Sequence, residues 1–246
     1  NHAFVESMMN VDQYGHSVSS RGTNQKETLF YNAVISDPTD LHIEVPIRKF
    51  KPDYAIAEWA WYCSRDPNVR NIGQLASIWN KIADDKNEVE SNYGTYLLGE
   101  QGTWVKNELL RDNDTRRATL VINQPYHKGK NNADYPCTQY LHFFIRNRSL
   151  HLGVHMRSND AVFGFCNDVF TFCMYQQMML NELNTFIAAN GDIETERIEL
   201  GHYYHSAGSF HVYETHFNMM DKIVQNYGAK HFSNSYNNPY PNLKKY

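Results

Sequence analysis

The chain has 246 residues, of which 41% are hydrophobic and 14% aromatic, and its formal net charge is −4. This length and composition favour one globular domain with a substantial core and exclude a disordered chain. A surface that binds nucleic acid or an anionic membrane is normally basic, so the charge predicts neither partner. No apolar run approaches the ~18 residues that a membrane-spanning helix needs.

The hydrophobic periodicity and the turn residues predict helices and strands in mixed order. In chain order we expect a strand over 41–46, helices over 53–65, 71–84 and 103–111, strands over 117–123, 138–146 and 149–156, a helix over 168–188, a strand over 196–204 and a helical segment over 214–227. The polar ends, residues 1–25 and 232–246, are predicted to be irregular. We interpret residues 1–246 as one α+β domain with a mixed or mostly antiparallel sheet.

The cysteines indicate a compartment and supply a candidate nucleophile. They are Cys63, Cys137, Cys166 and Cys173. They form no Cys-x-x-Cys pair, which counts against structural zinc and thioredoxin-like chemistry. Residues 1–20 show neither the basic nor the apolar segment of a secretion signal, so we expect reduced cysteines and a cytoplasmic location. The loosely spaced C-terminal histidines do not predict a metal site either.

Cys137 follows Pro136 at the point where the predicted strand 138–146 begins. A thiol held in this way becomes a nucleophile when a nearby cation or hydrogen-bond donor lowers its pKa. Free cysteines are more often small core residues, so Cys137 alone is a weak indication.

Two polar clusters suit an anionic ligand. Arg116 and Arg117 follow a polar turn, and paired guanidinium groups can clamp a phosphate, although solvated surface charge is the simpler interpretation. Arg157, Ser158, Asn159 and Asp160 follow an apolar strand, and segments that leave buried strands often carry functional residues.

The order of these residues along the chain resembles the thymidylate synthase superfamily, from about Arg21 to about His216. The landmarks that carry the resemblance are Glu58 in AEWAWYC, Trp79, Tyr93-Gly94, Asp114-Thr-Arg116-Arg117, Pro136-Cys137, Arg157-Ser158-Asn159-Asp160 and His211-Val-Tyr213. The resemblance implies the thymidylate synthase fold, with a large mixed sheet, packed helices and a symmetric dimer formed through the sheet.

The resemblance also implies a nucleoside monophosphate as substrate and 5,10-methylenetetrahydrofolate as co-substrate, with no metal. It implies that Cys137 is the nucleophile and that Glu58 is a buried acid that organises water. The phosphate would be held by Arg21, Arg157 and Ser158 of one subunit and by Arg116 and Arg117 of the other. Further ligand contacts would come from Asn159, Asp160 and Asn167, from His211 and Tyr213 at the sugar, and from Trp79 and Tyr93 at the folate.

Residue 168 bears on which base is accepted. The synthases of this family carry an asparagine eleven residues after the motif arginine, and here Arg157 is followed at that spacing by Asp168. An amide pairs with both polar groups of uracil, whereas a carboxyl group that shares a proton suits the amino group and N3 of cytosine. The neighbouring Asn167 would restore an amide if the alignment slipped by one residue.

The resemblance, together with Asp168, therefore implies transfer of a one-carbon unit to C5 of dCMP, with water completing the reaction to give 5-hydroxymethyl-dCMP; the residue types alone do not distinguish water from hydride. The runs MRSNDAVFGF and AGSFHVYETHF also resemble the phage deoxycytidylate hydroxymethylases within the superfamily. A phage enzyme of this kind would act in the cytoplasm of the infected bacterium. The alternatives are a thymidylate synthase, a dUMP or CMP hydroxymethylase, and a catalytically silent nucleotide-binding protein.

Overall fold

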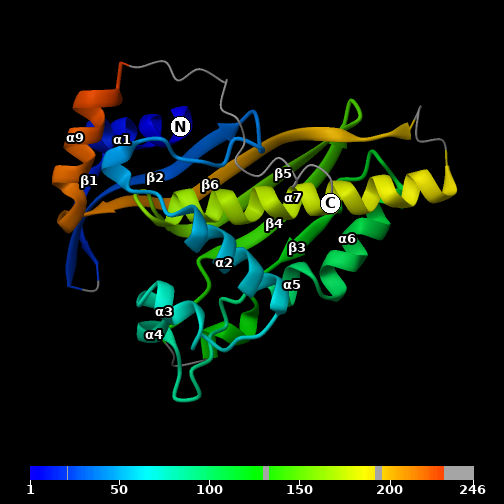
Figure 1. The fold of residues 1–246 in the computed structure, drawn as a ribbon, viewed down its shortest axis with the longest axis horizontal. Helices are drawn as coiled ribbons and strands as arrows, with labels where there is room; N and C mark the ends of the chain where they lie inside the picture. The colour runs from blue at the N-terminus through cyan, green and yellow to red at the C-terminus, as the bar shows by residue number, and fades with distance from the viewer. Residues whose placement is uncertain (21, 130–132, 192–195, 230–246) are drawn as a thin grey trace.

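The computed structural model describes residues 1–20, 22–129, 133–191 and 196–229, and its centre is a six-stranded sheet in the order β1-β2-β6-β5-β4-β3 (Figure 1). The strands are β1 His16–Ser20, β2 Thr23–Ile35, β3 Thr119–Val121, β4 Thr138–Arg146, β5 Ser149–Asp160 and β6 Glu199–Tyr213. Strands β5 and β6 run parallel, and all other neighbours are antiparallel. The mixed sheet and the α+β class are therefore as predicted.

Helices and short 3-10 turns surround this sheet. They are α1 His2–Tyr14, η1 Pro46–Arg48, α2 Pro52–Ser64, α3 Ile72–Leu75, α4 Ile78–Ile82, α5 Gly94–Leu97, α6 Glu100–Arg111, η2 Pro125–Gly129, α7 Gly164–Asn190, η3 Glu214–His216 and α9 Phe217–Tyr227. None of the helices in the described part of the chain is long and apolar enough to cross a membrane.

The predicted hairpin between β4 and β5 is present. Its turn residues, Asn147 and Arg148, both have positive φ angles, of 50° and 58°. Two consecutive left-handed residues produce the turn whose twist matches that of the flanking strands. Asn147 is well suited to this conformation, because asparagine tolerates it better than most residues.

Three predictions of secondary structure were wrong. Residues 1–25 are not irregular, because α1, β1 and the start of β2 lie there. The buried apolar residues of α1 recur at helical spacing: Phe4, Val5, Met8 and Val11. They were not recognised because the segment is mostly polar in composition. Residues 41–46 do not form a strand, although Leu41 and Val45 are buried.

The third error concerns residues 71–84, where two short helices, α3 and α4, replace the single helix that was predicted. Strands β5 and β6 continue beyond their predicted ends at 156 and 204, to Asp160 and Tyr213. This extension matters because the motif residues after the predicted ends lie on strands, which are more rigid than loops. The predicted irregular end, 232–246, lies outside the described residues.

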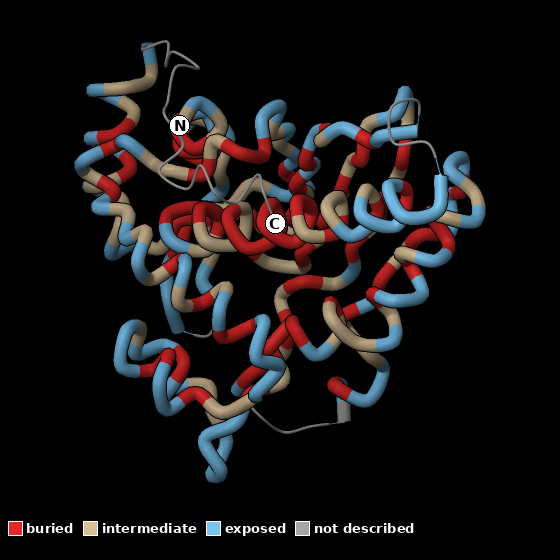
Figure 2. The backbone as a smooth tube through the Cα atoms, turned by 45° about the vertical axis from the view of Figure 1, so that its right-hand side comes forward, coloured by how far each residue is buried: buried red, intermediate tan, exposed pale blue. Residues whose placement is uncertain are grey.

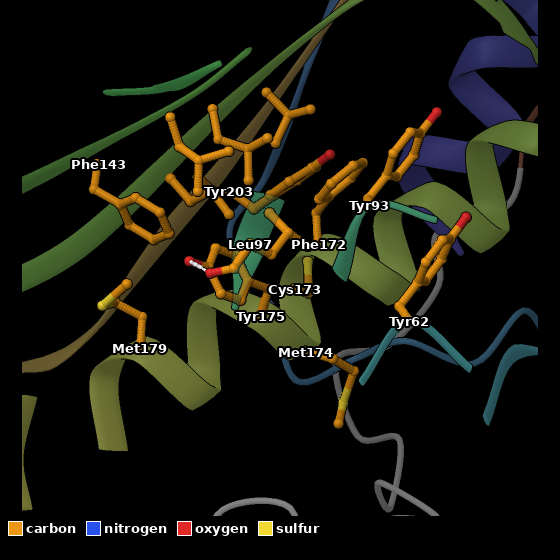
Figure 3. Close-up of a cluster of buried hydrophobic side chains, with 14 of the residues drawn as sticks. Tyr62, Tyr93, Leu97, Phe143, Phe172, Cys173, Met174, Tyr175, Met179 and Tyr203 are labelled. Carbon is orange, nitrogen blue, oxygen red and sulfur yellow. Dashed lines mark hydrogen bonds between the residues drawn. The ribbon is translucent and has the colours of Figure 1, made fainter. Parts of the chain in front are cut away.

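The long helix α7 lies across the sheet and is the centre of the core (Figures 1 and 2). Near its N-terminal half, the rings of Tyr62, Tyr93 and Phe172 form a continuous stack, with centroid distances of 5.4 and 5.9 Å (Figure 3). Stacked aromatic rings bury large apolar areas with defined geometry. This stack fixes α2 and α5 against the end of α7 from which the candidate site is built.

Candidate active site

A cavity of about 720 Å³ collects most of the residues that the sequence singled out. Eleven of them line it, namely Glu58, Trp79, Tyr93, Cys137, Ser158, Asn159, Asp160, Asn167, Asp168, His211 and Tyr213. They come from α2, α4, β5, α7 and β6 and from the segments that precede α5 and β4. A cavity of this volume, with polar groups that converge on it, is typical of a small-molecule site.

Cys137 is held at the cavity by Arg157. The backbone N–H of Arg157 donates to the carbonyl of Cys137 at 2.8 Å. Its guanidinium group donates to the carbonyls of Tyr135 at 2.7 Å and Pro136 at 3.2 Å. Arg157 thus braces the segment that carries the thiol. It does not itself line the cavity.

The carboxyl group of Glu58 projects into the cavity from α2. It accepts a hydrogen bond of 2.5 Å from the hydroxyl of Tyr54, one helical turn earlier, and that hydroxyl accepts one of 3.0 Å from the indole N–H of Trp79. Burial raises the pKa of Glu58 to about 7. A carboxyl group with such a pKa can exchange protons near neutral pH.

Tyr54 and Tyr62 are cavity residues that the sequence reasoning did not select. Both lie on α2 four residues from Glu58, so the three side chains share one face of the helix. That spacing is visible in the sequence, but it does not show whether the shared face is turned to the core or to a cavity.

Asp168 lies in the second turn of α7, where it is half-buried and lines the cavity. Burial, and secondarily the charge of Glu58, raise the pKa of Asp168 well above its usual range. The side-chain amide of Asn159 donates to Asp168 Oδ2 at 2.7 Å. A Cβ at Gly164 would lie 3.0 Å from Asn159 Nδ2, so glycine leaves room for this contact.

The C-terminal ends of β5 and β6 supply a second group of polar side chains. The ring of His211 is 3% exposed, and its Nε2 atom has no hydrogen-bond partner among the described residues. An unpaired buried nitrogen that lines a cavity suits a hydroxyl group of a ligand. Asp160 has a structural role as well, because its carboxylate accepts from the backbone N–H groups of Val162 and Phe163, just before α7 begins.

Basic residues at the cavity were also missed by the sequence reasoning. Arg48, Lys49 and Lys51 line it, and the buried guanidinium group of Arg48 lies 4.4 Å from the ring centroid of Phe163. Such a cluster attracts the anionic groups of a ligand. The run PIRKFKP shows the charges, but it does not show that they reach the same cavity as Cys137.

The twin arginines lie elsewhere. Arg116 and Arg117 are exposed and do not line the cavity of their own chain. The guanidinium group of Arg117 lies 3.5 Å from the carboxylate of Glu108. Arg21 is outside the described residues. Within the described ranges, no cluster of three or more histidine, cysteine, aspartate or glutamate side chains has metal-binding geometry.

Comparison with known proteins identifies the family. The thymidylate synthase family model matches residues 2–234. Deoxycytidylate 5-hydroxymethyltransferases of the enterobacteria phages T4 and T2 are 33% identical over 178 residues, which cover 69% of this chain and 70% of theirs. The deoxyuridylate hydroxymethyltransferase of Bacillus phage SP01 is 26% identical over 243 residues, or 92% of this chain and 58% of that protein.

The chain belongs to the thymidylate synthase family, as the match over residues 2–234 shows. Its class is that of the one-carbon transferases of this family, and its relatives include phage hydroxymethyltransferases for two different bases. The resemblance inferred from the motifs is confirmed at this level.

Because its pKa is raised, Glu58 should make the free energy of unfolding depend on pH. In the unfolded chain this group ionises near 4.5, whereas the folded protein keeps it protonated up to about pH 7. The wild type therefore loses stability as the pH rises through this window. Glu58→Gln, which cannot ionise, should gain up to about 3 kcal/mol relative to the wild type between pH 4 and pH 8.

Urea unfolding of both proteins across this pH range measures the difference. The exposed Glu100→Gln is the matched control and should show no comparable trend. A constant difference between Glu58→Gln and the wild type at all pH values would contradict the burial of an ionisable Glu58.

Proposed function

We propose that the protein is a dCMP 5-hydroxymethyltransferase, which transfers the one-carbon unit of 5,10-methylenetetrahydrofolate to C5 of dCMP and adds water to give 5-hydroxymethyl-dCMP. The observation that carries this proposal is the carboxyl group of Asp168. It lines the cavity that also contains Cys137, and its pKa is raised well above the usual range by burial. It therefore presents an O–H donor together with an acceptor oxygen.

This pair of groups matches the edge of cytosine. Cytosine offers an acceptor at N3 and an amino donor at C4, so a protonated carboxyl group donates to the first and accepts from the second. Uracil offers the reverse at these positions. When the carboxyl proton lies on the oxygen that faces N3, each mismatched pair in a buried site costs about 1–3 kcal/mol, which favours dCMP over dUMP.

The reaction would begin with addition of the Cys137 thiolate to C6 of the pyrimidine, which makes C5 nucleophilic. The folate supplies an electrophilic methylene carbon, to which C5 becomes bonded. Loss of tetrahydrofolate and of the C5 proton leaves an exocyclic methylene group on the ring. Water adds to that group, the thiolate leaves C6, and a proton is released to the site.

Residues of α2 suit the steps that involve water. Glu58, whose pKa is about 7, can accept and return a proton, and Tyr54 holds its carboxyl group by a hydrogen bond. Tyr62 adds a further hydroxyl-bearing side chain to the same wall. A polar wall of this kind favours a bound water molecule as the final reactant.

The residues present also fit the folate. Leu75 and Ile78 are exposed hydrophobic residues at the cavity, beside the buried ring of Trp79. Such a surface suits the flat rings of a folate, and the basic residues Lys49 and Lys51 suit its glutamate carboxylates.

A dUMP hydroxymethyltransferase is the second candidate. Asn167, which adjoins Asp168, also lines the cavity, and an amide there suits uracil. The relative from Bacillus phage SP01 carries a deoxyuridylate hydroxymethyltransferase name. The hydrogen bond from Asn159 favours dCMP, because it holds the carboxyl group of Asp168 in a defined position at the cavity. In the described part of the chain, Asn159 makes no such contact with the amide of Asn167.

Incubation with 5,10-methylenetetrahydrofolate and dCMP, dUMP or CMP tests the proposal. We expect dCMP to gain CH₂O, and mass spectrometry distinguishes this product from the CH₂ gain of methylation. Asp168→Asn should lower kcat/KM for dCMP and raise it for dUMP, each by about tenfold or more. Cys137→Ser should abolish turnover.

Turnover of dUMP alone by the wild type would contradict the assignment of dCMP. A CH₂ gain would contradict the role of water. Turnover that persists in Cys137→Ser would contradict the nucleophile.

We also propose that two copies pair through the open face of the sheet and that Arg116 and Arg117 act across this interface. A groove of about 600 Å³ on that face is lined by residues of β2, β4, β5 and β6, including Tyr140, Phe144 and Tyr204. A hydrophobic and aromatic sheet face of this kind is suited to burial against a second copy. The exposure of both arginines leaves them available to the other subunit.

Mixed dimers test the exchange of arginines. Cys137→Ser and the double variant Arg116→Ala, Arg117→Ala should each have little activity alone. In a mixed dimer, the site with the intact cysteine would receive intact arginines from the other subunit, so activity should return. Mixtures that stay inactive, although mass spectrometry shows mixed dimers, would contradict donation across the interface.

A further inference from the structure

A chain of hydrogen bonds leads from the core to Asp168. The hydroxyl of Tyr203 lies 2.9 Å from His205 Nδ1, and His205 Nε2 lies 2.9 Å from Asn159 Oδ1. Asn159 Nδ2 then donates to Asp168 Oδ2 at 2.7 Å. The first two side chains come from β6, the third from β5 and the last from α7.

The members of this chain behind Asp168 are shielded from water. Tyr203, His205 and Asn159 are 0%, 1% and 3% exposed. Burial lowers the pKa of His205 to about 3, so its ring is neutral and carries one N–H. The ring packs edge-on against Phe165, with 5.0 Å between centroids. A neutral histidine in this setting accepts at one nitrogen and donates at the other.

The hydrogen bonds of such a chain can run in either of two directions. If Tyr203 donates to His205, then His205 donates to Asn159 and Asn159 donates to Asp168, and every donor is paired. In the reverse direction the hydroxyl proton of Tyr203 would have no acceptor among the described residues. An unpaired buried donor is costly, so the direction that ends on Asp168 Oδ2 is favoured.

We propose that Tyr203 and His205 are positioning residues that orient the amide of Asn159 and thereby decide which oxygen of Asp168 carries the proton. This inference rests on the proposed function, because it explains how the enzyme would distinguish cytosine from uracil. Neither residue touches the base. Both act through Asn159.

The orientation determines what Asp168 presents to a bound base. Because Oδ2 accepts the amide N–H, the proton of the neutral carboxyl group is directed to Oδ1. Asp168 then offers a donor for N3 of cytosine and a lone pair for its amino group. If the amide turned round, the proton would move to Oδ2 to pair with the amide oxygen. Oδ1 would become an acceptor, which suits the N3–H of uracil.

Three variants test the proposal through the ratio of kcat/KM for dCMP to that for dUMP. Tyr203→Phe keeps the ring and removes the first donor, so the ratio should fall by roughly threefold to tenfold. His205→Phe removes the donor to Asn159 and should lower the ratio by about tenfold or more. His205→Gln keeps one acceptor and one N–H, so it should retain most of the preference.

Tyr175→Phe is the matched control. It also deletes a buried phenol group, one that donates to the carbonyl of Leu97 at 2.7 Å in the same core (Figure 3). Its ratio should stay within about twofold of the wild type, because a loss of stability alone lowers both activities together. Where a variant turns over too slowly, the ratio of the dissociation constants for dCMP and dUMP replaces the kinetic ratio.

The dCMP to dUMP ratio of the wild type distinguishes failure of the proposed function from failure of the positioning role of Tyr203 and His205. A wild type that does not prefer dCMP overturns the proposed function and this inference with it. A wild type that prefers dCMP, together with Tyr203→Phe and His205→Phe variants that keep the same preference, overturns this inference alone. A lowered ratio in these two variants and not in Tyr175→Phe supports it.

Discussion

The carboxyl groups of Glu58 and Asp168 line one cavity, where ionising either group costs free energy because it is buried. The other features of the site depend on this constraint. Burial raises the pKa of both, and the charge of Glu58 further opposes ionisation of Asp168. The helices that carry them, α2 and α7, pack against each other. The stack of Tyr62 and Tyr93 against Phe172 of α7 holds the two helices in place. Two acids kept neutral in this way are able to donate hydrogen bonds or protons near neutral pH.

The surroundings then give the two acids different roles. Glu58 accepts from Tyr54 and faces the polar wall of α2, which suits proton exchange with water. Asp168 accepts from the amide of Asn159, and the oxygen of that amide pairs with the buried His205 of β6, an arrangement that suits recognition of one base. Two acids on one scaffold can thus act differently because their hydrogen-bond partners differ.

Much of this arrangement was predictable from local sequence patterns. The hairpin of β4 and β5, the helix that carries Glu58 and the placement of Cys137 before β4 follow from residues that are neighbours in the chain. The partners of Asp168 were not predictable. The sequence shows Tyr203 and His205 only as alternating residues of a strand. The hydrogen bond of His205 to Asn159, which links both residues to Asp168, depends on the parallel pairing of β5 with β6. Helix α1 was not predicted for a related reason. Its few apolar residues indicate a helix only when the core against which they pack is known.

The protonation state of Asp168 in the free protein is the most direct test. Carbon-13 NMR of protein labelled at aspartate carboxyl groups reports each titration, and comparison with Asp168→Asn assigns the signal. We expect Asp168 to remain protonated at a pH where exposed aspartates are already ionised, because burial raises its pKa. Titration of Asp168 together with the exposed aspartates near pH 4 would contradict it, because an ionised carboxylate has no donor to offer to N3 of cytosine.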